Sequence, residues 1–97
     1  MATIYEERFI VAPDGLRLLL RMYSNVAGSE FPPIFCLHGL TRNSADFESV
    51  ALFLAELGHR VFAMDVRGRG RSDRDPDFSR YRPDVYAQDL LHILDTL

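Results

Sequence analysis

Residues 34–47, IFCLHGLTRNSADF, contain the change of pattern that decides how this chain folds. A continuous apolar run ends at His38 and Gly39, a short polar stretch follows, and apolar residues then return at helical spacing. A short, continuously apolar and β-prone run is typical of a strand that is covered on both faces. The stretch therefore predicts a buried strand over 34–37, a tight turn, and then a helix.

The helix is predicted over residues 44–57. Asn43 or Ser44 can cap its N-terminus, and Gly58 can end it. Helical periodicity places four residues on its buried face: Phe47, Val50, Ala51 and Leu54.

A second apolar run, HRVFAMD at 59–65, follows this helix after a short connection. It has the same continuous pattern as the first run, which again indicates a strand covered on both faces. Strand, helix and strand in this order predict a parallel βαβ unit. We expect the strands at 34–37 and 61–64 to lie parallel and adjacent.

The N-terminal part has a different pattern. Segments 3–11 and 16–23 flank the pair Asp14-Gly15, which is a strong signal for a β-hairpin turn. Residues alternate in the second segment, which predicts an antiparallel strand covered on one face. One face carries Leu16, Leu18, Leu20 and Met22, and the other carries Arg17, Leu19, Arg21 and Tyr23.

The C-terminal part consists of a loop from Val66 to about Arg82 and a helix that Pro83 opens. Its apolar stripe contains Tyr86, Leu90, Ile93, Leu94 and Leu97. In a doubly wound fold such a helix leads into another strand. We therefore expect an α/β chain in which the strand at 34–37 lacks its next neighbour. The alternative is a small four-stranded domain.

Composition and charge exclude several classes of protein. The chain has 97 residues, enough for one domain, and its net charge of −3 favours neither nucleic acid nor an anionic membrane. The single cysteine, Cys36, excludes an internal disulfide and indicates a small buried side chain. The first residues lack the pattern of a signal peptide, and no apolar run approaches the roughly 20 residues that span a bilayer. We expect a soluble, cytoplasmic chain.

The loop HGLTRN at 38–43 carries the first chemical signal. Ligands of open α/β sheets bind at the C-terminal ends of the strands. Gly39 allows a sharp turn and a close approach of the backbone to a substrate. The N–H of Leu40 can then point into the crevice, as an oxyanion-hole donor does. We expect His38 to fix the loop through hydrogen bonds rather than to transfer protons.

The loop MDVRGRGRSDRD at 64–75 carries the second signal. Gly68 and Gly70 match the start of a dinucleotide fingerprint, but position 73 is Asp and no helix follows closely. The arginines alternate with aspartates and have no aromatic platform for RNA. This pattern predicts a tight loop whose charges pair with one another and whose arginines are exposed.

Both loops lie within CLHGLTRNSADFESVALFLAELGHRVFAMDVRGRGRSD, residues 36–73, which resembles the N-terminal part of the α/β-hydrolase superfamily. The shared motifs are H-G-x after the third strand and D-x-R-G-x-G-x-S after the fourth. YRPDVYAQDLLHILDTL, residues 81–97, resembles the helix that precedes the nucleophile strand of that superfamily.

The resemblance implies a role for each matching residue. Leu40 stands where a backbone N–H forms half of the oxyanion hole, in a loop shaped by His38 and Gly39 together with Thr41. The second motif, which in the family supports the fold and the floor of the active site, is carried by Asp65, Arg67, Gly68, Gly70 and Ser72. No cofactor and no metal are implied.

Two departures from the family pattern matter. Thr41 replaces the proline of the H-G-x-P form, which favours serine-nucleophile enzymes over epoxide hydrolases and haloalkane dehalogenases. The nucleophile elbow G-x-S-x-G is absent, and the triad acid and histidine would follow it in chain order. Residues 1–97 are therefore expected to be a partial domain that lacks the elbow, the lid and the C-terminal strands.

Three hypotheses follow. In the first, the chain is the N-terminal segment of a serine-type hydrolase of carboxylic esters or related acyl or carbon–carbon bonds. It would be inactive alone and would need a C-terminal remainder to act on a small ester-like substrate. In the second, it is a non-catalytic binding module of the same fold. In the third, the arginine loop binds nucleic acid, which the acidic composition disfavours.

Overall fold

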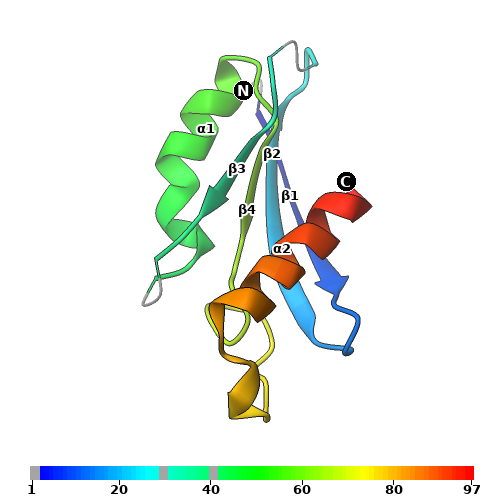
Figure 1. The fold of residues 1–97 in the computed structure, drawn as a ribbon. Helices are drawn as coiled ribbons and strands as arrows, with labels where there is room; N and C mark the ends of the chain where they lie inside the picture. The colour runs from blue at the N-terminus through cyan, green and yellow to red at the C-terminus, as the bar shows by residue number, and fades with distance from the viewer. Residues whose placement is uncertain (1–2, 29–30, 40–41) are drawn as a thin grey trace.

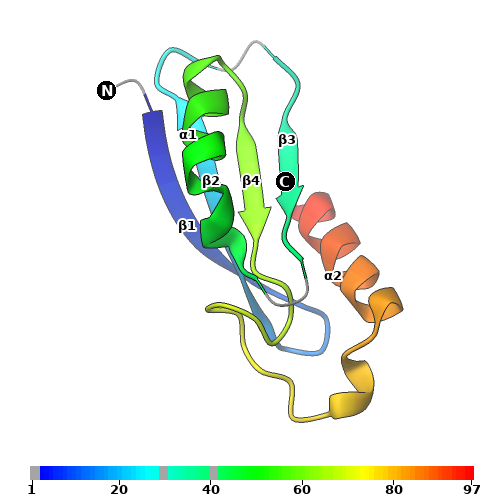
Figure 2. The same ribbon diagram turned by 90° about the vertical axis from the view of Figure 1, so that its left-hand side faces the viewer.

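The structure is a four-stranded sheet in the order β1-β2-β4-β3 (Figure 2). It comes from a computed structural model that describes residues 3–28, 31–39 and 42–97. The strands are β1 (Thr3–Val11), β2 (Arg17–Asn25), β3 (Ile34–Leu37) and β4 (Val61–Met64). The fourth strand in the chain thus lies between the second and the third.

Strand pairing agrees with both sequence predictions. β1 and β2 form an antiparallel hairpin whose register runs from Thr3 opposite Asn25 to Val11 opposite Arg17. β3 and β4 are parallel neighbours, with Leu37 opposite Met64. β2 and β4 pair antiparallel and so join the hairpin to the parallel pair in one sheet. The predicted hairpin and the predicted parallel pair are confirmed.

Helices connect and follow the parallel strands. A 3₁₀ turn, η1 (Ser44–Phe47), leads into α1 (Glu48–Glu56), and a second turn, η2 (Phe78–Arg80), precedes α2 (Pro83–Thr96). The Asn43 side chain accepts a hydrogen bond from the N–H of Ala45, which caps η1. Gly58 ends the helical segment at a φ of 106°. No helix among the described residues is long and apolar enough to cross a membrane.

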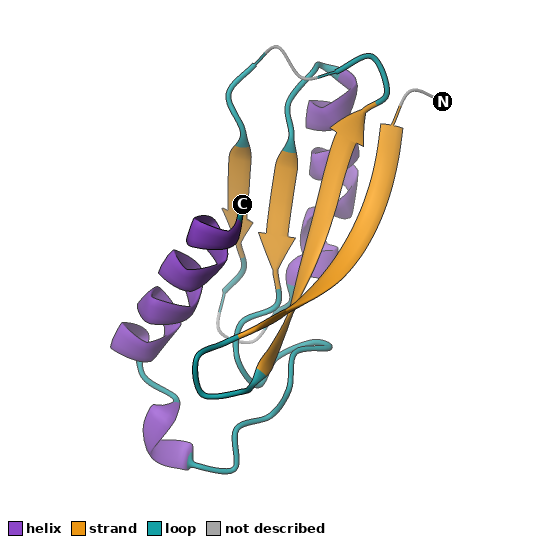
Figure 3. Ribbon diagram, turned by 90° about the vertical axis from the view of Figure 1, so that its right-hand side faces the viewer, coloured by secondary structure: helices purple, strands orange, loops and turns teal. Residues whose placement is uncertain are grey.

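The two helices cover opposite faces of the sheet (Figures 1 and 3). Because β2 and β4 occupy the centre, their alternating side chains supply the core on both sides. The buried cluster on the α2 side contains Leu18, Leu20, Phe62, Met64 and Ile93. The cluster on the α1 side contains Tyr23, Ala51, Ala55 and Val61.

Two expectations about burial are wrong. The segment 16–23 was expected to be covered on one face, yet Leu18, Leu19 and Leu20 are all fully buried. β2 is an inner strand with a helix over each face, so its alternation does not mark a solvent side. On α1, small alanines allow close contact with the sheet, whereas Val50 lies outside this contact and is 46% exposed.

β3 forms one edge of the sheet in the part of the chain that the structure describes. Leu37 is 51% exposed and Cys36 is half-buried, so the expectation that this run is covered on both faces is also wrong here. Beside this edge lies an apolar groove of about 300 Å³. The groove is lined by Pro33, Ile34, Phe35, Arg60, Phe62, Leu94 and Leu97.

The packing of α1 predicts unequal effects at neighbouring positions. Ala51→Leu forces a larger side chain into a fully buried site, so we expect the free energy of unfolding to fall by about 1–3 kcal/mol. Val50→Leu is the matched control and should change it by less than about 0.5 kcal/mol. Urea denaturation of both variants measures this, and equal losses would contradict the assignment of the buried face.

Candidate active site

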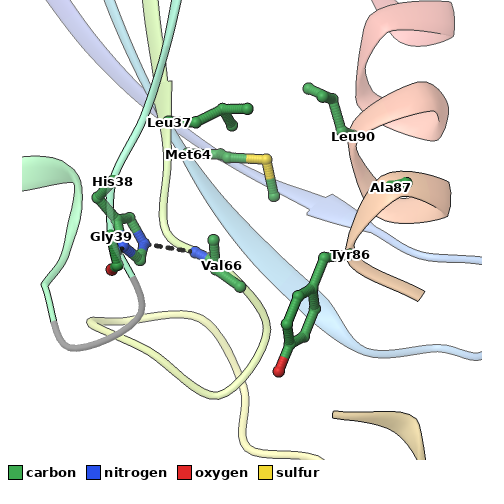
Figure 4. A pocket seen from close by; sticks show the side chains of 8 residues that line it. All are labelled: Leu37, His38, Gly39, Met64, Val66, Tyr86, Ala87 and Leu90. Carbon is green, nitrogen blue, oxygen red and sulfur yellow. Dashed lines mark hydrogen bonds between the residues drawn. The ribbon is translucent and has the colours of Figure 1, made fainter. Parts of the chain in front are cut away.

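An open cavity of about 380 Å³ lies at the C-terminal ends of β3 and β4, beside α2 (Figure 4). Its walls are mostly apolar, and the titratable side chains among its lining residues are those of His38 and Tyr86. The lining residues are Leu37, His38, Gly39, Met64, Val66, Tyr86, Ala87 and Leu90. A mostly apolar hollow with a few polar groups suits the body of a small organic molecule.

His38 holds the first turn of the loop through both ring nitrogens. The backbone N–H of Val66 donates to His38 Nε2 at 3.0 Å (Figure 4), so Nε2 carries no proton. Nδ1 lies 2.6 Å from the Gly39 carbonyl oxygen and donates to it. The neutral Nδ1–H form makes this pair of bonds. Both ring nitrogens of His38 are thus hydrogen-bonded to backbone groups of the two loops that follow β3 and β4.

Gly39 lines the cavity, but its backbone does not need glycine. Its φ lies outside the left-handed region, and among the described residues the nearest atom to an added Cβ would be the Arg42 Cγ at 4.0 Å. The N–H of Arg42 donates to the Gly39 carbonyl oxygen at 3.0 Å, so the chain does turn back after Gly39, although the φ of Gly39 does not require glycine. Leu40 and Thr41, which the sequence assigns to the same loop, lie outside the described residues.

Asp65, at the end of β4, organises the first buried polar network. Its carboxylate accepts hydrogen bonds from the backbone N–H of Ser44 at 2.7 Å and of Arg71 at 3.0 Å. The Ser72 hydroxyl donates to the Asp65 carbonyl oxygen at 2.6 Å and accepts from the N–H of Leu19 at 2.8 Å. These hydrogen bonds join three segments that are distant in sequence: β2, the start of η1 and the loop after β4.

Arg67 organises the second network from a buried position. Its guanidinium bonds to Asp89 through two nitrogens at 2.9 and 2.7 Å. It also contacts Asp14 at 2.6 Å and Asp75 at 2.8 Å. The expectation that the arginines of this loop are exposed is wrong for Arg67, which is 2% exposed, and fits Arg69, Arg71 and Arg74. Three carboxylates thus accept the hydrogen bonds of the buried guanidinium in place of water.

This arrangement shifts the pKa values of two of its members, Arg67 and Asp14. Hydrogen bonding to Asp89 is the main cause that raises the pKa of Arg67 well above its usual range, with Asp14 and Asp75 adding to it against the effect of burial. The hydrogen bond from Arg67 lowers the pKa of Asp14. Both shifts favour the charged forms of Arg67 and Asp14, which suits a structural tie between the hairpin turn and the loop after β4.

Two glycines of the second motif are required by close contacts. Gly68 has a φ of +77°, and a Cβ there would lie 2.5 Å from the Tyr81 ring. Gly70 has a φ of +51°, and a Cβ there would lie 2.4 Å from the Asp65 carboxylate. Both the left-handed backbone and the lack of space exclude larger residues. The G-x-G pair thus serves packing within the loop.

Sequence reasoning missed two partners of Arg67. Asp14 was interpreted as a turn residue, and Asp89 was not singled out. The sequence did carry one signal for Asp89, because it stands next to the apolar stripe of the last helix. A carboxylate buried there is stable only if a cation is buried beside it.

The two other histidines of the chain lie near backbone carbonyl groups and away from the cavity. His59 lies 2.8 Å from the Pro32 carbonyl oxygen, and His92 lies 2.8 Å from that of Val11, both outside the cavity. Within residues 3–28, 31–39 and 42–97, no cluster of His, Cys, Asp or Glu side chains is arranged to bind a metal ion. The described site therefore consists of a cavity, a loop fixed by His38 and two buried networks.

A family model for the alpha/beta hydrolase fold matches residues 32–97, which is most of the chain. The chain belongs to the α/β-hydrolase family. The crystal structure of an α/β hydrolase from Novosphingobium aromaticivorans is similar to it with a TM-score of 0.85 and 46% identity. That match covers 95% of this chain and 31% of the other. The predicted fold class, the N-terminal part of an α/β-hydrolase sheet, is confirmed.

Curated relatives of this α/β-hydrolase chain have several activities. The 3-hydroxybutyrate-oligomer hydrolase of Cupriavidus necator is 36% identical over 86 residues, which cover 87% of this chain and 28% of that protein. Epoxide hydrolase 1 of Siraitia grosvenorii is 33% identical over 91 residues, which cover 94% of this chain and 28% of that protein. The chain thus spans less than a third of the length of these relatives.

The Arg67 cluster predicts a large loss of stability when its cation is removed. Arg67→Met leaves the carboxylates of Asp75 and Asp89 buried without their partner, so we expect the free energy of unfolding to fall by about 3–5 kcal/mol. Arg74→Met, an exposed position of the same loop, should change it by less than about 0.5 kcal/mol. Similar urea midpoints for both variants would contradict the structural role of Arg67.

The lowered pKa of Asp14 predicts how its contribution depends on pH. A folded-state pKa below the unfolded value of about 3.9 means that the stabilisation is complete above that value and is lost as pH falls through the folded pKa. We expect Asp14→Asn to be less stable than wild type at pH 7, and the difference to shrink below about pH 4. Asp95→Asn, an exposed acid on α2, is the control. A difference that persists unchanged at pH 3 would contradict the prediction.

Proposed function

We propose that this chain supplies the oxyanion-hole loop of a serine-type α/β hydrolase that cleaves a carboxylic ester or a related acyl or carbon–carbon bond. In this proposal the N–H of Leu40 donates to the oxygen that becomes negative when a nucleophile attacks the carbonyl carbon. The carbonyl would sit against the loop at Gly39, where the absence of a side chain leaves room. The apolar cavity would hold the acyl or alcohol part of the substrate.

The observation that carries the proposal is the placement of His38 and Gly39 at a cavity between two parallel strand ends. His38 is hydrogen-bonded at both nitrogens, so it suits a role in shaping the loop. A backbone donor needs no titratable group, only a loop that is held in position. The identity of 36% to an oligomer hydrolase supports hydrolysis of an ester-like bond.

The nucleophile and the rest of the triad are proposed to lie on a remainder of the protein. No serine of this chain stands in a G-x-S-x-G pattern. The edge of β3 and the apolar groove beside Leu94 and Leu97 would receive the next strand, which in this proposal carries the nucleophile. The 97 residues alone would then bind no oxyanion productively and would not turn over an ester.

Epoxide hydrolysis is the second candidate, because an epoxide hydrolase is 33% identical over 91 residues. Against it stands Thr41, where the H-G-x-P form common in those enzymes has proline. Assays of the complete protein with a p-nitrophenyl ester and with an aromatic epoxide separate the two candidates. If the complete protein hydrolyses the epoxide but not the ester, the second candidate function replaces the first.

The proposed donor predicts unequal losses of activity at neighbouring positions. In the complete protein, Gly39→Val should lower kcat/KM for a p-nitrophenyl ester by up to about 10²–10³-fold, because its side chain blocks the approach to the donor. Leu40→Ala should lower it less, because the backbone N–H survives the truncation. We expect the Gly39→Val protein to stay folded, since no described atom lies closer than 4.0 Å to an added Cβ, and circular dichroism of the variant checks this. Equal activity of wild type and Gly39→Val would overturn the proposal.

A further inference from the structure

β1 forms the edge of the sheet opposite β3, and no strand pairs with its outer side in the part of the chain that the structure describes (Figure 3). Four of its apolar or aromatic side chains are between 38% and 56% exposed: Ile4, Tyr5, Phe9 and Val11. The unpaired N–H and C=O groups of an edge strand are a template for a further strand. The outer side of β1 is therefore an open pairing surface.

The hairpin register decides which backbone groups of β1 face outward. The N–H of Ala12 donates to the Leu16 carbonyl oxygen at 2.8 Å, so the backbone groups of Ala12 point toward β2. The register then continues without interruption along the whole of β1. Because the direction of these groups alternates along a strand, even-numbered residues bond to β2 and odd-numbered residues point outward. A further strand can bond only to the odd positions.

The sequence of β1, TIYEERFIV, is complementary to itself when two copies run antiparallel about Glu7. In that register odd positions lie opposite odd positions, as the outward backbone groups require. Glu6 of each copy lies opposite Arg8 of the other, so an ion pair can form on each side of the axis. Tyr5 of each copy lies opposite Phe9 of the other, and aromatic pairs of this kind also stabilise a sheet.

The neighbouring antiparallel registers fit less well. A register centred on Glu6 places that glutamate opposite its own copy, and a register centred on Arg8 does the same with the arginine. Like charges directly opposite one another destabilise strand pairing. The register about Glu7 is the one of these three that places the glutamate and the arginine opposite each other.

Glu7 would face its own copy at the centre of this register, but its charge is already paired. Its carboxylate forms an ion pair with Arg71 of its own chain and accepts a hydrogen bond from the Tyr5 hydroxyl. The Glu6 and Arg8 side chains, in contrast, form no ion pair and no hydrogen bond with any described residue. The two charges that the described fold does not use are therefore those that complement a second copy.

We propose that β1 is a dimerisation edge: two copies of this chain pair antiparallel about Glu7 and join their sheets into one. The occupant is a second copy because the charge pattern of the strand complements itself. Edge strands that avoid pairing carry devices such as proline or a bulge, and β1 has neither. The surface lies at the far edge of the sheet from the cavity, so this inference does not depend on the proposed function.

The experiment measures dimerisation of the complete protein by sedimentation velocity over a range of concentrations. Arg8→Glu places glutamates opposite glutamates, and Glu6→Arg places arginines opposite arginines. We expect either change to raise the dimer dissociation constant by about 10–100-fold, because each attractive pair becomes repulsive. Asp95→Arg, an equal change of charge at an exposed position of α2, should leave it within about twofold. A dimer that is equally tight in all four proteins would overturn the inference.

Mixing the two single variants tests the pairing itself. A chain with Glu6→Arg carries two arginines at these positions, and a chain with Arg8→Glu carries two glutamates. In the mixed dimer every arginine again lies opposite a glutamate. We expect the mixture to dimerise about as tightly as wild type, whereas each variant alone dimerises weakly. A purely structural effect of either substitution predicts no rescue, and a mixture that stays monomeric would refute the proposed register.

Amide hydrogen exchange identifies what lies along β1 in the complete protein. In the proposed dimer the N–H groups of Tyr5, Glu7 and Phe9 bond to the second copy, so their exchange should slow as the protein concentration rises. Slow exchange of these amides in a monomeric protein would mean that another segment of the same chain covers the edge. Fast exchange at every concentration would mean that the edge stays open. Either result contradicts the inference.

Discussion

Parallel hydrogen bonding between β3 and β4 is the constraint on which the candidate site depends. Two strands that run in the same direction end at the same edge, so the chain leaves Leu37 and Met64 side by side. His38 can therefore reach the N–H of Val66, and Ser44 can return to Asp65. An antiparallel pair would have sent these two loops to opposite ends of the sheet, and neither contact could form.

The Arg67 cluster extends this order to the rest of the chain. One guanidinium ties the hairpin turn at Asp14, its own loop at Asp75 and helix α2 at Asp89. A buried ion pair adds little net stability over an apolar cluster of the same size, yet removal of one member is costly. Such a tie specifies one arrangement of α2 on the sheet. The position of α2 in turn places Tyr86 and Leu90 in the wall of the cavity.

The edge of β3 and the groove beside α2 show where the described fold is open. Leu37, Leu94 and Leu97 are each at least 45% exposed along this side of the sheet. An apolar edge strand pairs readily with a further strand, and the chain covers only 28% of each of two curated relatives. The proposed nucleophile strand would cover this surface and bring its serine to the cavity at the same time.

Local pattern in the sequence was enough to determine the elements, the hairpin, the parallel pair and the two loops that carry the motifs. These features depend on neighbours in the chain: alternation, apolar runs, Asn43 as a cap and Asp14-Gly15 as a turn. The local pattern could not predict the burial of Leu19, the exposure of Val50 or the half-exposed side chain of Cys36. Each of these depends on which helix or strand lies opposite the residue.

Tertiary structure alone decided the two polar networks. Arg67 and Asp89 are separated by 22 positions, and Arg67 and Asp14 by 53, so no local rule pairs them. The same holds for Ser44 and Asp65, whose contact needs the β3–β4 register and the start of η1 to be in place. A hydrogen bond is short-ranged and directional, so it forms only after packing has fixed the backbone on both sides to within fractions of an ångström.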